Sequence, residues 1–248
     1  MMLRVFTLLC FAFVGQVSHA GTLSWVSQDR WVTVAKVIDG DTFTTRKKEK
    51  VRLLGINTPE KRHETSAAEP FGQAAKLGLQ KLIAGKQVRL SFDQERQDKY
   101  GRTLAHVYLR DGLWINAEML RLGFAHVYTF APNISAAKEL IKFEQTAIQE
   151  NKGIWQHKRW RVLKLEDLNS AMLGQFRLMR GEVSIFDKRA WRFKLGKLMV
   201  SVPKKYRKGF KAGLDIVKGE HVLVRGRLRM TRKGQWYMSI HTPSDISH

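Results

Sequence analysis

Three short stretches of the chain combine carboxylates, an amide and arginines at close spacing. They are Asp39–Thr42, Arg52–Glu60 and Asp98–Arg102. Carboxylate, amide and carbonyl oxygens are the ligands that a hard cation such as Ca²⁺ takes. An acid can orient or deprotonate a water molecule, and arginines can stabilise a crowded, anionic phosphorus centre. This mixture of residue types predicts hydrolysis of a phosphodiester bond.

The charge of the chain agrees with a phosphate-containing substrate. The 248 residues carry a formal net charge of +22, and the pI is near 10.4. Such an excess predicts a polyanionic partner: nucleic acid first, then acidic polysaccharide or a membrane surface. Charge alone does not distinguish these from a cationic protein without a specific partner, so the motifs must decide.

Residues 1–20 have the pattern of an export signal. Arg4 precedes an apolar run, Val5–Val14, and Ser18-His19-Ala20 is a small-residue cleavage signal. The run is shorter than the roughly 20 residues that span a bilayer, although an uncleaved anchor is the alternative. Cleavage after Ala20 would remove Cys10, the only cysteine, and with it any internal disulfide. We expect a secreted or periplasmic protein with no stable membrane span.

The periodicity of the first half predicts a mainly β fold with helices. After a short linker at 21–30, five strands and one helix follow in the order of an OB-type Greek-key barrel. The expected strands are 31–38, 41–45, 50–54, 87–92 and 103–109, with the helix at 70–85 before the fourth strand. Helices at 115–122 and 135–151 follow, and this domain is expected to cover 31–160.

The second half repeats this order after a linker at 161–173. The expected strands are 175–186, 190–195, 197–202, 222–229 and 236–240, with a helix at 203–217. We therefore predict a second, small OB-like barrel over 174–248. Residues 170–248 contain 18 lysines or arginines and 5 acidic residues. Rings interleave the charge and could stack on single-stranded nucleic acid, but strand alternation favours them as core. These are Trp191, Phe193, Tyr206, Trp236 and Tyr237.

In an OB barrel, the loops that join strands 1–2 and 4–5 border the binding face. Asp41 lies at the first of these loops and Arg102 at the second, while Arg52 lies on the third strand. Residues far apart in the sequence would thus meet on one surface.

At these residues the chain resembles the staphylococcal nuclease family, also called thermonucleases. The resemblance covers roughly Trp31 to Trp155 and includes the helix start Glu69–Gly72. It implies an OB barrel with appended helices. It also implies calcium-dependent cleavage of DNA and RNA at the bond between phosphorus and the 5′ oxygen.

The resemblance also assigns metal ligands. Asp41 resembles a direct calcium ligand, and Thr58 would offer its backbone carbonyl. The family commonly has a second aspartate where this chain has Asn57. An amide oxygen can still bind Ca²⁺ but brings no charge, so we expect weaker calcium binding or tolerance of another divalent ion.

The remaining roles are catalytic or concern substrate binding. Glu60 would hold the attacking water, as general base or as orienter. Arg52 and Arg102 match the arginines that clamp the scissile phosphate. Residues that resemble nucleotide contacts are Lys99, Tyr100 and Tyr128.

Other interpretations remain open. Taken singly, each motif could be turn chemistry or general polyanion binding, but together they favour catalysis. The main rival is a catalytically silent binding module, like the repeated domains of Tudor staphylococcal-nuclease proteins. A cationic protein that binds heparin-like or membrane anions is a third possibility. A structural zinc site is not expected, because the histidines at 63, 106, 126 and 157 lack zinc spacing and cysteine partners.

Overall fold

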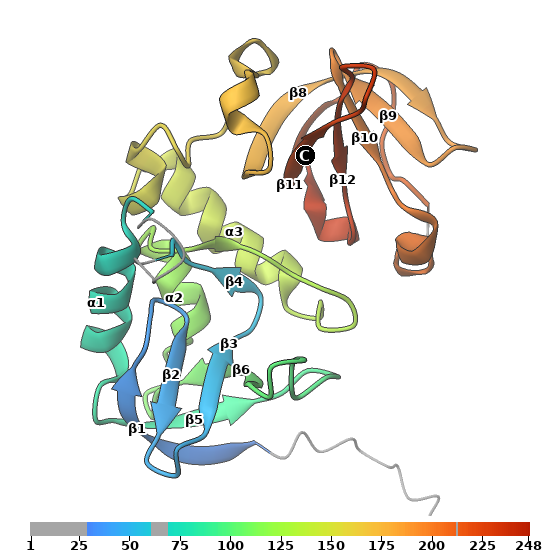
Figure 1. Ribbon diagram of the computed structural model, residues 1–248. Coiled ribbons are helices and arrows are strands. Elements are labelled where there is room, and N and C mark those ends of the chain that lie inside the picture. Colours follow the sequence, from blue (N-terminus) through green and yellow to red (C-terminus); the bar gives the residue numbers. More distant parts are fainter. Residues whose placement is uncertain (1–28, 61–68, 212) are drawn as a thin grey trace, which may run out of the picture.

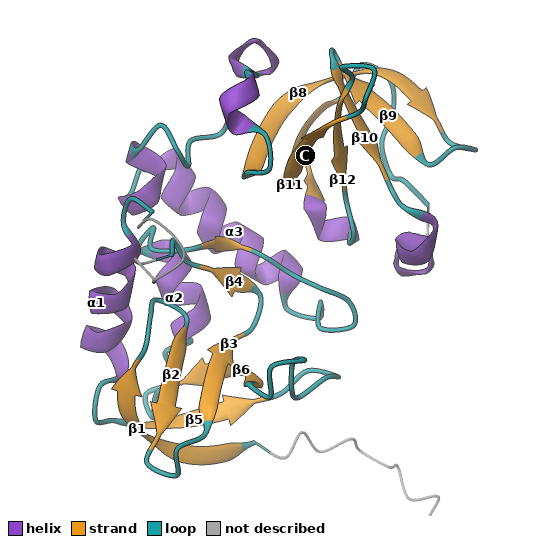
Figure 2. Ribbon diagram, viewed as in Figure 1, coloured by secondary structure: helices purple, strands orange, loops and turns teal. Residues whose placement is uncertain are grey.

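The computed structural model describes residues 29–60, 69–211 and 213–248. The expected export signal and His63 lie outside these residues. Two β-barrels follow one another along the chain, with helices between them (Figures 1 and 2). Within the described residues, no helix combines the length and the apolar character needed to cross a membrane.

The first barrel is closed by five strands in the order β1-β2-β3-β6-β5. Their bounds are β1 Arg30–Val37, β2 Thr42–Thr45, β3 Lys50–Leu53, β5 Gln87–Ser91 and β6 Thr103–Tyr108. Neighbours are antiparallel except β3 and β6, which are parallel. Alternate apolar residues fill the interior: Val34, Phe43, Val51, Leu90 and Val107 are at most 1% exposed. This order confirms the predicted OB-type barrel.

Three helices pack on this barrel. They are α1 Gly72–Ile83, α2 Ile115–Arg121 and α3 Ala137–Gln149. The chain leaves α1 through Gly85, whose φ of +70° favours glycine. A ribbon that the sequence did not predict pairs β4, Ile56–Asn57, with β7, His126–Val127.

The second barrel repeats the order of the first. Its strands are β8 Phe176–Asp187, β9 Arg192–Leu195, β10 Leu198–Ser201, β11 His221–Met230 and β12 Trp236–Ser239. They pair as β8-β9-β10-β12-β11, β11 pairs back with β8, and only β10 and β12 are parallel. A short strand, β13 Ile246–Ser247, joins β11. The predicted second OB-like barrel is therefore present, and Phe193 and Trp236 belong to its core, as expected.

One predicted element is wrong. The expected helix at 203–217 is only a 3₁₀ turn, Lys204–Gly209, followed by irregular chain. Gly209 and Gly213 are poor helix formers, and Gly213 has a φ of +84°. Phe210 and Leu214 are nevertheless buried in the second core, so their apolar spacing reflects packing of a loop.

The two barrels pack against each other through α3, which lies between them in Figure 1. A shared apolar cluster contains Ala147 and Trp155 from the first domain and Leu178 and Leu223 from the second. Beside it, Arg225 on β11 donates to Glu144 on α3 over 2.6 Å, and both side chains are at most 1% exposed. The segment expected as a linker packs as well, since Leu163 and Leu168 are buried in the second core. The domains thus meet at a packed junction.

Candidate active site

Asp41 is placed by a tight turn between β1 and β2. Oδ1 of Asp39 accepts from the backbone N–H of Asp41 over 3.2 Å, as in a turn closed by an aspartate. A Cβ at Gly40 would lie 2.7 Å from both the Cβ of Ala75 and Oγ1 of Thr58. Glycine therefore allows α1 and Thr58, which directly follows β4, to approach the turn closely. This places Asp41 directly beside Thr58.

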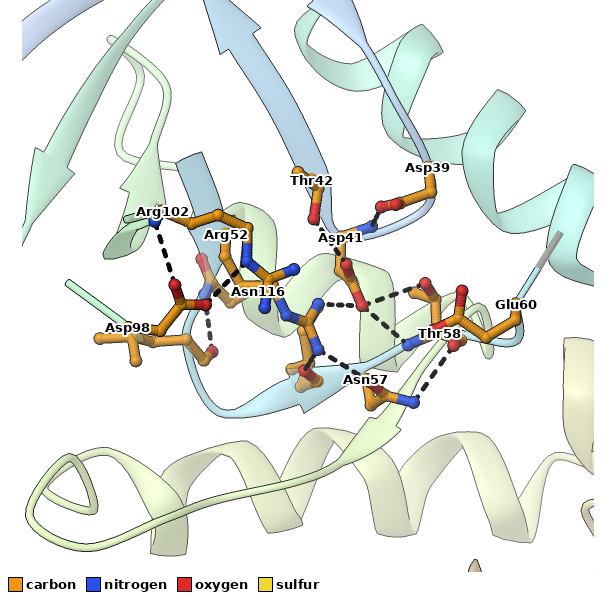
Figure 3. Close-up of polar contacts among 12 residues, drawn as sticks. Asp39, Asp41, Thr42, Arg52, Asn57, Thr58, Glu60, Asp98, Arg102 and Asn116 are labelled. Atoms are coloured by element: carbon orange, nitrogen blue, oxygen red, sulfur yellow. Dashed lines mark hydrogen bonds and ion pairs between the residues drawn. The ribbon is translucent and has the colours of Figure 1, made fainter. Parts of the chain in front are cut away.

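Thr58 and Arg52 both contact the Asp41 carboxylate. Oδ2 of Asp41 accepts from the backbone N–H of Thr58 over 3.1 Å and from its hydroxyl over 3.2 Å. Nη1 of Arg52 forms an ion pair with the same oxygen. Oδ1 accepts from the hydroxyl of Thr42 over 3.0 Å. Asp41 is only 6% exposed, so this cluster is a buried, hydrogen-bonded part of the site (Figure 3).

Asn57 links Arg52 to the Thr58 carbonyl. Its amide oxygen accepts from Nη2 of Arg52 over 2.8 Å, and its amide nitrogen donates to the carbonyl of Thr58 over 3.2 Å. Arg52 also donates to the carbonyl of Ile56 over 3.2 Å. Figure 3 shows Glu60 next to Thr58, at the edge of the same cluster. The three expected metal ligands and Glu60 are therefore together.

The parallel pairing of β3 and β6 brings the second arginine to the first. Arg52 lies opposite Leu104 in this pair, and Arg102 immediately precedes β6. Nε of Arg102 donates to Oδ2 of Asp98 over 2.7 Å, and its backbone N–H donates to Oδ1 over 3.0 Å. Asp98 lies in one of the three predicted motifs but had no role assigned to it, and it thus fixes the orientation of Arg102. Figure 3 shows Arg52 and Arg102 side by side.

The closeness of the two arginines has an electrostatic consequence. Burial, together with repulsion from Arg102, lowers the pKa of Arg52 to about 10. Arg52 is still protonated at neutral pH, so two cations are held next to each other in a partly desolvated place. An anion such as a phosphate, bound by both arginines, would relieve this repulsion and would fit the forked geometry of the guanidinium groups.

A cavity of about 550 Å³ lies in front of these arginines. Arg52 and Arg102 line it, together with the three predicted nucleotide contacts, Lys99, Tyr100 and Tyr128. Tyr100 is 72% exposed, so its ring is accessible to a base. Lys99 and Arg102 lie over the same ring, at 5.0 and 5.6 Å from its centroid. The arrangement can hold a phosphate between cations and rings next to a cluster of oxygen ligands.

Two long-range features that the sequence analysis missed complete the site. The β4–β7 ribbon, with a further bond from the Tyr128 N–H to the Gly55 carbonyl over 2.9 Å, carries Tyr128 into the cavity. Asn116, which is fully buried on α2, donates to the Leu54 carbonyl and accepts from the Val107 N–H, both over 2.8 Å. It fixes the chain between Arg52 and Asn57. Neither feature has a short-range sequence signal.

Comparison with known proteins decides the family. Residues 50–157 match the family described as staphylococcal nuclease homologue. The thermonuclease of Staphylococcus intermedius is 36% identical over 126 residues, which cover 50% of this chain and 74% of that protein. The chain belongs to the staphylococcal nuclease family.

Other relatives agree. The thermonuclease of Staphylococcus hyicus is 30% identical over 127 residues, 50% of this chain and 75% of that protein. Endonuclease YncB of Bacillus subtilis (strain 168) is 36% identical over 129 residues, 50% of this chain and 61% of that protein. The expected family and the expected enzyme class, a hydrolase of the nuclease type, are confirmed. The family match ends at residue 157, before the second barrel.

Proposed function

We propose that the chain is an exported, divalent-metal-dependent nuclease that hydrolyses the bond between phosphorus and the 5′ oxygen of DNA or RNA. The observation that carries this proposal is the meeting of Arg52 and Arg102 at one cavity, beside the oxygen cluster of Asp41, Asn57 and Thr58. The second barrel would bind the substrate strand and raise its local concentration at the first barrel.

The oxygen donors of the site fit a hard cation such as Ca²⁺. A carboxylate, an amide oxygen and a carbonyl from Asp41, Asn57 and Thr58 are the ligand types that Ca²⁺ prefers. Within the described residues, no three His, Cys, Asp or Glu side chains gather as a metal-binding group. Amide and carbonyl oxygens would therefore have to supply part of the coordination. When bound, Ca²⁺ would polarise the scissile phosphate and offset its charge.

The protein side chains supply the rest of the chemistry. Glu60 would orient a water molecule and take its proton as the water attacks phosphorus in line with the 5′ oxygen. The bond to the 5′ oxygen then breaks, which leaves a 3′ phosphate and a 5′ hydroxyl that gains a proton. Arg52 and Arg102 would stabilise the additional negative charge on the phosphoryl oxygens during the attack.

Export and substrate binding by the second barrel rest on charge and sequence pattern. The export signal expected at 1–20 supports a secreted or periplasmic location. The excess of basic residues over 170–248 and the OB topology of the second barrel support nucleic-acid binding. The mass of the exported protein would test the first point, because cleavage after Ala20 leaves Gly21 as the new N-terminus.

A single set of digests tests the catalytic proposal. Plasmid and single-stranded DNA are incubated with the purified protein and Ca²⁺, with excess chelator, and with Glu60→Gln in place of the wild type. We expect degradation with Ca²⁺, none with chelator, and a loss of rate of about 10²- to 10⁴-fold in the variant. End-group analysis should find 3′ phosphates on the products.

The rival function is nucleic-acid binding without cleavage. Two observations favour it. Arg52 already forms an ion pair with Asp41, and Asn57 adds no negative charge to the expected metal ligands. Retardation of DNA in a gel without degradation, under every divalent ion tried, would support the rival and contradict the catalytic proposal.

A further inference from the structure

A second cavity, of about 210 Å³, lies at the junction of the two barrels. The first domain lines it with Tyr128 and Phe130, and the second with Phe176, Arg225, Arg227 and Arg229. Basic and aromatic side chains from two domains therefore converge on one cavity, which is separate from the cavity of the catalytic arginines.

The alternation of β11 directs its arginines to this cavity. Val224 and Leu228 on one face of the strand are buried in the second barrel. Arg225, Arg227 and Arg229 occupy the alternate positions, so they share the opposite face, about 6.7 Å apart along the strand. The sequence Arg-Gly-Arg-Leu-Arg thus builds a row of cations that faces the nuclease domain.

Arg225 is unusual because it is buried but only partly paired. It is 1% exposed, and its Nη1 donates to Glu144. Among the residues that the structure describes, Nε and Nη2 of Arg225 have no hydrogen-bond partner. Leaving buried guanidinium N–H groups unpaired costs free energy, so the two nitrogens are suited to an anionic acceptor that enters the cavity.

The acidic groups nearby are already engaged. The second oxygen of Glu144 accepts from the Val127 N–H over 2.7 Å. Asp245, which also lines the cavity, accepts from the backbone N–H groups of His241 and Thr242 over 2.7 and 2.9 Å. With three arginines against these two carboxylates, the cavity keeps a positive balance, although Nη1 of Arg227 donates to the Gly174 carbonyl.

The junction cavity and the catalytic cavity share a wall. Tyr128 and Phe130 line both. The ring of Tyr128 lies edge-to-face with Phe130 at 4.5 Å and with Phe176 at 5.3 Å between centroids. Phe130 is 48% exposed, so a base passing between the cavities would meet an aromatic surface on which it can stack.

We propose that the junction cavity is a second phosphodiester-binding site for the same single strand that is cut at Arg52 and Arg102. Arg225, Arg227 and Arg229 would bind a phosphate group beyond the scissile one, and Tyr128 and Phe130 would support the intervening base. A cavity of about 210 Å³ is too small for a duplex, so the proposed ligand is part of a single strand. This inference rests on the proposed function only in the identity of the ligand as nucleic acid.

Binding of short and long oligonucleotides tests the site. Fluorescence anisotropy would give dissociation constants for a labelled thymidine dinucleotide, which has a single phosphodiester, and for a labelled oligothymidylate of about 12 nucleotides. Glu60→Gln protein is used, with chelator present. The test variant is Arg227→Gln/Arg229→Gln, which removes two exposed cations and leaves polar side chains in their place. The control is Lys188→Gln/Arg189→Gln, which removes the same charge from exposed positions of the β8–β9 turn.

We expect the test variant to bind the long strand about tenfold more weakly and with a smaller salt slope. The dinucleotide should be bound equally by all proteins, because its single phosphodiester cannot occupy both cavities. The control should change long-strand binding by less than about twofold, as expected for distant, screened charge. Equal losses in the test and control variants, or no loss in the test variant, would overturn the site.

Arg225 requires a separate variant because it holds the junction. Arg225→Lys keeps a cation for Glu144 but removes the forked second nitrogen. We expect weaker binding of the long strand with a melting temperature near that of the wild type. Unchanged long-strand binding in a folded Arg225→Lys protein would count against the role of this side chain.

Cleavage measured in parallel separates this inference from the proposed function. A wild-type protein that retains length-dependent binding but never cuts leaves the site standing and refutes catalysis. A protein that cuts short and long strands with equal kcat/KM would support catalysis. If this ratio is also unchanged in the Arg227→Gln/Arg229→Gln variant, the second phosphate site is refuted.

Discussion

Arg52 forms an ion pair with Asp41, so the guanidinium expected to hold the scissile phosphate contacts the carboxylate expected to bind the metal. Asn57 accepts from the other terminal nitrogen of the same guanidinium. The proposed phosphate and metal subsites would therefore share one arginine, so a change of charge in one would alter ligand binding in the other. The proposed chemistry depends on the balance of charge around Arg52.

Asn57→Asp should tighten Ca²⁺ binding by about tenfold, because a carboxylate adds a negative charge where the amide oxygen now lies. Calorimetric titration of the substrate-free protein measures this directly. Asn151→Asp, at an exposed position after α3, adds the same charge elsewhere and should leave the affinity unchanged. An unchanged Ca²⁺ affinity in Asn57→Asp would refute the idea that the uncharged amide of Asn57 weakens Ca²⁺ binding.

Asp98→Asn should lower kcat/KM by about tenfold, because it weakens a charge-assisted bond that orients Arg102. Ca²⁺ affinity should not change, since Asp98 contacts Arg102 and not the oxygen cluster. A double-mutant cycle provides the check: in an Arg102→Ala background, the same substitution should have little further effect. Full additivity of the two losses would show that Asp98 acts in another way.

Glu144→Gln should reduce the free energy of unfolding by about 3 kcal/mol, because it leaves Arg225 as a buried charge without its counterion. Urea unfolding of the whole chain measures the loss. Glu139→Gln on the same helix breaks an exposed pair with Lys142, whose side chains are 52% and 69% exposed, and should cost less than about 1 kcal/mol. Similar losses in both variants would mean that the buried Arg225–Glu144 pair contributes no more to the free energy of unfolding than an exposed pair.

Stability should also fall in mild acid because of His126. This side chain is 2% exposed, and its ring stacks on Phe176 at 4.7 Å between centroids. Burial, reinforced by nearby arginines, lowers its pKa to about 3 against the 6.5 of an exposed histidine. Between these values the unfolded chain takes up a proton that the folded protein does not, so stability decreases as the pH falls from 6.5 towards 3.

The size of this effect can be isolated by substitution. Between pH 7.5 and 5, His126 alone should account for roughly 2 kcal/mol of lost stability. His126→Gln should remove that part of the pH dependence, whatever its effect at pH 7.5. Urea unfolding at pH 7.5, 6.5 and 5 gives the free energy of unfolding of both proteins. If it depends on pH in the same way in both, His126 is not buried in its neutral form.

The sequence predicted those parts of the molecule whose causes are local. Alternating residues such as Val32 and Val34 indicated the first strand, and the turn at Asp39-Gly40 indicated where Asp41 would lie. Because two barrels share one strand order, even the second fold was accessible from periodicity. The failed helix at 203–217 marks the limit, since Phe210 and Leu214 have helical spacing but are buried as a loop.

What the sequence could not predict depends on contacts between distant segments. Asp98 precedes Arg102 by four residues, yet its role depends on the side-chain orientation at the cavity. The role of Asn116 depends on its hydrogen bonds to the backbone of Leu54 and Val107, which are distant in the sequence. Arg225 was counted only as one basic residue among many. Its burial against Glu144 appears when both domains are folded together.

The packed junction bears on how far a strand must reach. Ala147 and Trp155 pack against Leu178 and Leu223, so the proposed second phosphate site lies close to the catalytic arginines. If both sites act on one strand, fragments long enough to reach both would be degraded first, and shorter ones would accumulate at the end of a digest. The size of the limit products would then measure, in nucleotides, the distance between the two cavities.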